Sequence, residues 1–136
     1  MEWINGEFKI NDDKSLIVVD KVCELISKSY WAPLRPREIT ELSIKNSICY
    51  GVYHNSEQIG YARVVTDFAT MFWLCDVIID ESHRGRGLGK MLVKCIVESD
   101  DLKGKLGILV TRDAHELYAK HGFIRDAQSF MRMPRK

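Results

Sequence analysis

The sequence predicts one domain of the α/β or α+β class, in which strands and helices mix around a single sheet. The chain has 136 residues, which is the length of one ordinary domain. Hydrophobic residues make up 46% of it, enough for a buried core and too many for a disordered chain. Runs typical of strands alternate with apolar residues at helical spacing, in the order β-α-α-β-β-β-α-β-α-β-β. No repeat, linker or low-complexity tract divides residues 1–136.

The N-terminal third of the chain predicts one strand and two helices. A short first strand is expected at residues 7–10, and the polar residues 11–13 form a turn. Apolar residues at helical spacing then predict a helix over residues 16–29. Pro36 suits the first turn of a second helix, which is expected to end near residue 46.

The middle of the chain predicts a hairpin, a central strand and a helix. Residues 47–54 and 58–65 are apolar and β-branched on either side of a short polar link, which is typical of a β-hairpin. A turn at residues 67–69 leads to the central strand. Residues 74–79 are almost uniformly apolar, as expected for a strand buried on both faces. Helical spacing resumes over residues 88–99.

The C-terminal part predicts short elements. A strand is expected at residues 106–110, and Asp113 is a suitable N-cap for a helix that ends before Gly122. The last strand candidates are residues 123–124 and 130–133.

Composition excludes several classes of function. The net charge of +1 argues against binding along nucleic acid, since basic residues are balanced by acidic ones. The four cysteines are widely spaced among apolar neighbours, which indicates reduced core residues of a cytoplasmic protein and no metal site. Residues 1–14 are too polar for a signal peptide, and no apolar run approaches the roughly 18 residues that a membrane helix needs. We therefore expect neither nucleic-acid nor membrane partners.

The glycine-rich stretch at residues 83–89 joins the central strand to the following helix. The first N–H groups of a helix have no partner inside it, and the helix dipole adds partial positive charge at that end. Arg84, Arg86 and Lys90 supply further positive charge. The stretch therefore predicts a phosphate-binding site, with a tight turn that binds no ligand as the alternative.

Two common phosphate motifs are excluded by spacing. A P-loop would need a glycine at Arg84 and a serine or threonine at Met91, where no hydroxyl is available to hold magnesium. The dinucleotide fingerprint would need a glycine at Lys90. What remains after the strand is the pattern Arg84-x-x-Gly87-x-Gly89.

This pattern resembles the acyl-CoA pyrophosphate loop of the GNAT-type N-acetyltransferases. A second stretch resembles the helix that follows the fifth strand in that family: Ala114-x-x-Leu117-Tyr118-x-Lys120-x-Gly122-Phe123. The two motifs occur in the family's order and at about its spacing. Thr111 departs from the pattern, because many members carry an asparagine there.

The resemblance covers nearly the whole chain and is most specific over residues 64–123. It implies a small bacterial single-domain GNAT protein over residues 1–136, with a mixed, mostly antiparallel central sheet and flanking helices. The implied activity is transfer of an acetyl group from acetyl-CoA to a primary amine by direct attack in a ternary complex, without a metal. The competing class is a non-catalytic CoA-binding sensor or interaction module with the same fold.

The resemblance also implies where acetyl-CoA would be held. The pantetheine arm would pair with the strand backbone, and the N–H of Val77 could polarise the thioester carbonyl. The pyrophosphate would bind to N–H groups of the glycine-rich loop. The expected cofactor-binding residues are Val77, Ile78, Ile79, Arg84, Gly85, Arg86, Gly87, Leu88, Gly89 and Lys90.

Two residues are candidates for proton transfer. Tyr118 falls on the family's tyrosine position, and with a normal pKa of about 10 it could protonate the leaving thiolate. The alternative is that Tyr118 only packs beneath the cofactor. Asp76, the one acid in the apolar central strand, is the candidate base, unless it is hydrogen-bonded at a strand bulge for structural reasons. A water chain could also replace a side-chain base.

The expected acceptor site lies in the loop between the first two helices, which borders the acceptor pocket in this family. Trp31 and Arg35, beside Tyr30, would suit an acceptor with an acidic or planar part, unless Trp31 packs on the hairpin and Arg35 is solvated. Asp67 is a third candidate for substrate binding, although a turn cap is its more common role. The acceptor, a small-molecule or peptide amine, is not identified, and a homodimer through the C-terminal strands is an open expectation.

Overall fold

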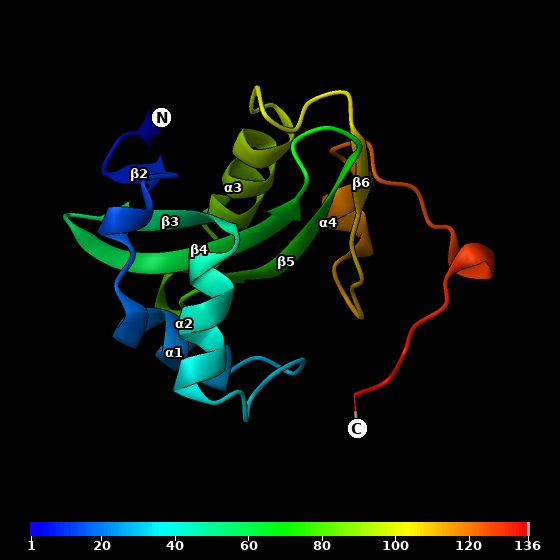
Figure 1. Ribbon diagram of the computed structural model, residues 1–136. Helices are drawn as coiled ribbons and strands as arrows, with labels where there is room; N and C mark the ends of the chain where they lie inside the picture. The colour runs from blue at the N-terminus through cyan, green and yellow to red at the C-terminus, as the bar shows by residue number, and fades with distance from the viewer. Residues whose placement is uncertain (136) are drawn as a thin grey trace.

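The computed structural model describes residues 1–135, so Lys136, the last residue of the predicted domain, lies outside the described residues. One six-stranded sheet runs through the molecule in sequence order (Figure 1). Neighbouring strands are antiparallel up to β5, and β6 is parallel to β5. The predicted mixed, mostly antiparallel sheet is confirmed. Its strands are β1 Glu2–Asn5, β2 Phe8–Asn11, β3 Ile48–His54, β4 Glu57–Thr66, β5 Met71–Ile79 and β6 Leu106–Ile108.

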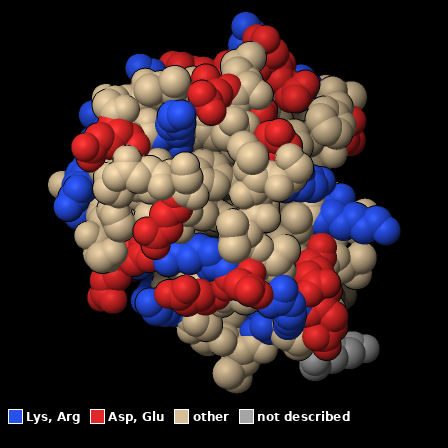
Figure 2. All heavy atoms as spheres, turned by 90° about the vertical axis from the view of Figure 1, so that its left-hand side faces the viewer, with Lys and Arg blue, Asp and Glu red and all other residues tan. Residues whose placement is uncertain are grey.

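Helices cover both faces of the sheet. Helices α1 (Val19–Ser27) and α2 (Arg37–Lys45) lie on one face, and α3 (Leu88–Val97) lies on the other (Figure 1). The short helix α4 (His115–Ala119) lies beside β6. Figure 2, turned toward the side of β2 and β3, shows acidic and basic side chains interspersed over that face, as the net charge of +1 leads one to expect.

The sheet separates two hydrophobic clusters. Alternate residues of a strand point to opposite faces, so the neighbours Tyr61 and Ala62 of β4 enter different clusters. Tyr61 packs with buried residues of α1 and α2, and Ala62 packs with the apolar face of α3. Because β4 and the second half of β5 are buried on both sides, they form a rigid base for the loops at the end of β5.

The β5 strand carries a bulge at Asp76, which has a left-handed backbone with φ of +52°. The pairing register with β4 shifts at this point, between Tyr61 and Arg63. On the other edge of β5, the parallel pairing with β6 ends at Trp73 opposite Ile108. Residues 74–79 therefore have no strand partner on that edge, and a slot opens between the ends of the two strands.

Two expectations for the N-terminal part of the chain differ from the structure. Strand β1, whose side chains are mostly exposed, was not predicted because it has no buried face to give an apolar pattern. Helix α1 begins only at Val19, since residues 14–16 form a 3₁₀ turn in which Asp13 accepts a hydrogen bond from the N–H of Ser15 at 2.9 Å. The boundaries of α2, α3 and the hairpin match their predictions within three residues.

The C-terminal expectations need correction as well. Residues 123–124 and 130–133 form no strand within the described chain, and Ile124 is 88% exposed. Asp113 does not cap α4. The N-cap is Ala114, which makes no side-chain hydrogen bond, so the Asp113 carboxylate is left for other contacts. Gly122, with φ of +94°, does follow the end of the helix as expected.

All four cysteines are free thiols, with Cys49 and Cys95 buried and the other two half-buried. Within residues 1–135, no three histidine, cysteine or acidic side chains lie close enough together to hold a metal ion. None of the helices in these residues has the length and apolar character required to span a bilayer.

Candidate functional site

A cleft of about 520 Å³ opens where the ends of β5 and β6 separate. Its volume falls within the range of small-molecule sites. The walls come from the end of β5, the glycine-rich loop, the loop after α1 and the start of α4. The lining includes Lys28, Tyr30, Trp31, Val77, Ile78, Ile79, Arg84, Gly85, Gly87, Leu88, Gly89, Arg112, Asp113 and Tyr118.

The glycine-rich loop presents a run of free backbone donors. The N–H groups of residues 85–90 make no hydrogen bond within the described chain, and the first helical bond runs from Met91 N to the carbonyl of Gly87 at 3.0 Å. Gly85 and Gly87 have left-handed φ values of +81° and +75°, and a Cβ on either would meet no atom within 4 Å. Arg84 fixes the loop on β5 because its Nε donates to the carbonyl of Ile79 at 3.2 Å. The loop therefore forms an anion-binding concavity at the start of α3.

Most of the predicted cofactor residues lie together in the cleft. Val77, Ile78 and Ile79 of β5 line it, as do Arg84 and every residue from Gly85 to Gly89 except Arg86. Arg86 and Lys90 do not line it, although their N–H groups belong to the free run.

Tyr118 enters the cleft from α4. The residue is 9% exposed and lies edge-on to Phe123, with ring centroids 5.9 Å apart. Its hydroxyl makes no hydrogen bond to any described residue, and it is not sealed from solvent. Burial, with smaller contributions from Tyr30 and Asp113, raises the pKa of Tyr118 to about 12. The side chain is therefore a protonated donor at neutral pH.

Asp76 is the centre of a buried ionic cluster behind the cleft. Its Oδ1 accepts hydrogen bonds from Trp31 Nε1 at 2.8 Å and Arg35 Nη2 at 3.3 Å, and its Oδ2 accepts from Arg35 Nη1 at 2.8 Å and Arg63 Nε at 2.9 Å. Four donors fill the four acceptor positions of one carboxylate. Burial opposes ionisation, but the two guanidinium groups outweigh it and hold the pKa of Asp76 below its usual value.

Asp76 was expected to be either a base or a carboxylate that is hydrogen-bonded at a strand bulge for structural reasons. The structure agrees with the second role. No lone pair is left for an incoming amine, and Asp76 does not line the cleft. This geometry argues against the expected role as a base.

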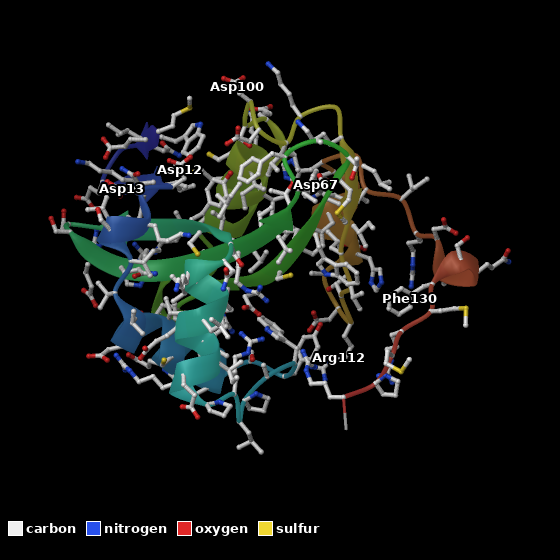
Figure 3. The ribbon with its side chains drawn as sticks, viewed as in Figure 1. Asp12, Asp13, Asp67, Asp100, Arg112 and Phe130 are labelled. Carbon is white, nitrogen blue, oxygen red and sulfur yellow. The ribbon has the colours of Figure 1, made fainter. Side chains whose placement is uncertain are left out.

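The three expected substrate-binding residues have different positions. Trp31 lines the cleft, whereas the guanidinium of Arg35 is occupied by Asp76 and lies outside the lining. Asp67 caps the turn before β5, accepting from the N–H groups of Ala69 at 2.9 Å and Thr70 at 2.8 Å. The nine residues of β5, about 30 Å of strand, separate that turn from the glycine-rich loop. Figure 3 shows Asp67 well above Arg112, and Asp67 does not line the cleft, so the structure does not bring Asp67 to the candidate site.

Arg112 was not among the predicted site residues, and Asp113 was expected only to cap a helix. Both line the cleft. The guanidinium of Arg112 stacks on the ring of Tyr30, 3.8 Å from its centroid, and the backbone N–H of Arg112 donates to the Tyr30 hydroxyl at 2.8 Å. The available signal was topological, because residues that follow parallel strands meet at one edge of the sheet.

Comparison with known proteins agrees with this geometry. The family model described as "Acetyltransferase (GNAT) domain" matches residues 45–125, which is more than half of the chain and includes the glycine-rich loop and Tyr118. The chain belongs to the GNAT acetyltransferase family. The resemblance inferred from the two motifs is therefore confirmed.

Solved structures support the GNAT fold over nearly the whole chain. A GNAT-family protein from Xanthomonas campestris superposes with a TM-score of 0.88 and 34% identity, covering 93% of this chain and 92% of its own. A GNAT-family acetyltransferase from Elizabethkingia anophelis, solved with acetyl-CoA bound, shares the fold at a TM-score of 0.67 and 16% identity, covering 88% of this chain and 78% of its own. Among sequences, a candidate acetyltransferase of Gibberella zeae is 26% identical over 152 residues, or 94% of this chain and 85% of that protein.

Proposed function

We propose that this GNAT protein transfers an acetyl group from acetyl-CoA to a primary amine, by direct attack of the amine in a ternary complex. The observation that carries the proposal is that the free N–H run at the start of α3 and the unbonded hydroxyl of Tyr118 line one cleft. A fold neighbour solved with acetyl-CoA bound supports the choice of acyl donor.

The residues present fit the chemical groups of acetyl-CoA. Its pyrophosphate is an anion, and residues 85–90 offer consecutive backbone donors with the positive end of the α3 dipole. Its pantetheine arm carries amide groups, and the unpaired edge of β5 at residues 74–79 offers backbone partners for them. The two glycines at positive φ leave the space beside the loop free of side chains.

In the proposed transfer, the amine nitrogen attacks the thioester carbonyl carbon, so a C–N bond forms and the C–S bond breaks. Tyr118 donates its hydroxyl proton to the leaving sulfur, because it is protonated and has no competing partner in the protein. The proton lost by the amine passes to solvent. We assign Asp76 a positioning role, because it forms the bulge next to Val77, which lines the cleft and carries the N–H proposed to polarise the thioester carbonyl.

The test is thermal unfolding of three proteins with and without acetyl-CoA: wild type, Gly87→Glu and Gly104→Glu. Gly104 is a matched control, because its φ of +78° is close to that of Gly87, a Cβ there also meets no atom within 4 Å, and it lies outside the cleft. Acetyl-CoA at 100 times its dissociation constant should stabilise wild type and Gly104→Glu by about 2.7 kcal/mol. Gly87→Glu should not respond.

The proposal fails at its first step if acetyl-CoA stabilises none of the folded proteins, or all three equally. Thiol release on adding amines then tests catalysis separately. Stabilisation by acetyl-CoA with no release from any amine would indicate a non-catalytic CoA-binding module.

A further inference from the structure

Arg112 is held in a fixed orientation at the mouth of the cleft. Its guanidinium stacks on the Tyr30 ring at 3.8 Å, and its backbone N–H is bonded to the same residue's hydroxyl. The side chain is 67% exposed, and the nearest carboxylate oxygen, on Asp113, is 4.0 Å away, which is too long for a hydrogen bond. The stacked face is therefore occupied, and the N–H edge of the guanidinium is free.

A chain of contacts connects Arg112, through Tyr30 and Trp31, to the buried ionic cluster around Asp76. Tyr30 lies edge-on to Trp31, with ring centroids 5.1 Å apart at 88°. Trp31 is in turn held by its 2.8 Å hydrogen bond to Asp76. All of these contacts are made by residues of the protein itself, so they orient Arg112 without help from a bound molecule, which lowers the entropy cost of binding.

Asp113 supplies an opposite charge beside it. It is the only acidic residue among the described residues that line the cleft, and its carboxylate accepts no hydrogen bond in residues 1–135. Because it does not cap α4, the carboxylate has no structural use in the fold. The helix that Asp113 precedes carries Tyr118, so its charge lies near the proposed site of transfer.

We propose that the acceptor is a zwitterionic amine of the amino-acid type, whose carboxylate is bound by Arg112 and whose amino group is bound by Asp113. This inference rests on the proposed acetyl transfer and names its acceptor class. A carboxylate can receive two parallel hydrogen bonds from a guanidinium edge, and an ammonium group can donate to Asp113. The charges that receive them lie 4.0 Å apart, a separation that one small molecule carrying both groups can span.

The other charges of the cleft disfavour polyamines. Lys28, Arg84 and Arg112 line it against the single carboxylate of Asp113, so a molecule with several ammonium groups would face repulsion. The phosphates of CoA have their own donors at residues 85–90, which leaves Arg112 for the acceptor.

The experiment compares amines that differ only by a carboxylate. Thiol release from acetyl-CoA is measured with glycine against methylamine, β-alanine against ethylamine, and 4-aminobutyrate against propylamine. Wild type should prefer the carboxylate-bearing member of at least one pair by about tenfold or more in kcat/KM, as expected for a charge-assisted hydrogen-bonded pair.

Variants then locate the preference. Arg112→Gln should lose it without changing the KM for acetyl-CoA, and Arg112→Lys should restore part of it. Asp113→Asn should lower kcat/KM for both members of a pair. Arg125→Gln, which removes the same charge from an exposed residue outside the cleft, should behave as wild type.

Several results would overturn the proposal. One is equal use of both members of every pair, and another is a preference that survives in Arg112→Gln. A raised KM for acetyl-CoA in Arg112→Gln, with the preference unchanged, would assign Arg112 to a phosphate of the cofactor. If no amine in the panel reacts and no amino acid raises the unfolding midpoint of the CoA-bound protein, the acceptor class is wrong. The response to acetyl-CoA alone still decides the proposed function separately.

Discussion

Replacing Asp76 by asparagine tests the buried cluster directly. Asparagine tolerates the left-handed backbone at this position, so the bulge itself is preserved. Its single carbonyl oxygen can accept two of the four donors. Arg35 and Arg63, whose side chains are 11% and 15% exposed, then lose their compensating charge.

Breaking a buried ion pair from one side costs about 3–5 kcal/mol, and the remaining amide oxygen places this variant at the lower end, near 3 kcal/mol. That is a large part of the 5–15 kcal/mol that typically stabilises a domain (about 0.1 kcal/mol per residue). With a urea dependence of about 1–3 kcal/mol per molar, the unfolding midpoint should fall by about 1–3 M. The assay is urea unfolding at neutral pH, followed by tryptophan fluorescence and circular dichroism.

Asp20→Asn is the matched control. It removes the same charge from an ion pair with Arg37, but Asp20 is 83% exposed and Arg37 is 53% exposed. Exposed pairs contribute about 0–1 kcal/mol, so its midpoint should barely move. Equal shifts in the two variants would refute the reasoning, since the burial of the cluster would then contribute nothing. Adding Arg35→Gln to Asp76→Asn should recover part of the loss, because it removes one of the unpaired charges.

Two further outcomes follow from the ionisation states. Because the folded pKa of Asp76 lies below its value in the unfolded chain, about 3.9, its contribution is complete above that pH and is lost as pH falls through the folded pKa. The difference in unfolding free energy between wild type and Asp76→Asn should therefore narrow below about pH 4, measured by urea unfolding at several pH values; a gap that stays constant down to pH 2 would contradict the assignment. Tyr118→Phe should lower kcat by about 10²–10⁴-fold, because it removes the proposed acid, and leave stability almost unchanged, because the hydroxyl has no partner to lose. Thiol-release kinetics and thermal unfolding check the two halves of that expectation, and unchanged kcat would leave Tyr118 with a packing role only.

Much of the fold was predictable because its signals are local. The apolar run of β5, the glycines before α3 and the spacing of apolar residues in α3 all lie within one stretch of about 25 residues. The periodicity of apolar residues in a strand or helix, and the positive φ that favours glycine, each depend on only a few neighbouring residues. Strand β1 lacks such a signal, and residues 123–124 and 130–133 have one although they form no strand within the described chain.

The candidate site was predictable only in part, for a related reason. The anion-binding loop is continuous in sequence, so its residues were found together. The partners of Asp76 come from other elements, with Arg35 lying 41 residues away and Arg63 lying 13 residues away. Tyr30 and Arg112 are 82 residues apart, and only the closing of β6 beside β5 brings them into contact. The sequence suggested Arg35 as the cation of the acceptor site, whereas the structure pairs Arg35 with Asp76 and leaves Arg112 in the cleft. No local sequence pattern could have indicated this difference.

The short ladder between β5 and β6 means that the two parts of the candidate site are attached to the sheet in different ways. The anion-binding loop joins β5 to α3, whereas Tyr118 belongs to the segment that begins at β6. That segment pairs with the sheet through only three residue pairs, and Tyr118 itself is buried in the main hydrophobic cluster. Because β5 and β6 share fewer residue pairs than any other two neighbouring strands, we expect local opening of the sheet to begin there. On warming, Tyr118, the proposed acid, should therefore leave the cleft before the proposed anion-binding loop unfolds. Pantetheine bound in the slot would contact both β5 and the segment that carries Tyr118, and it would therefore stabilise the closed arrangement of the two.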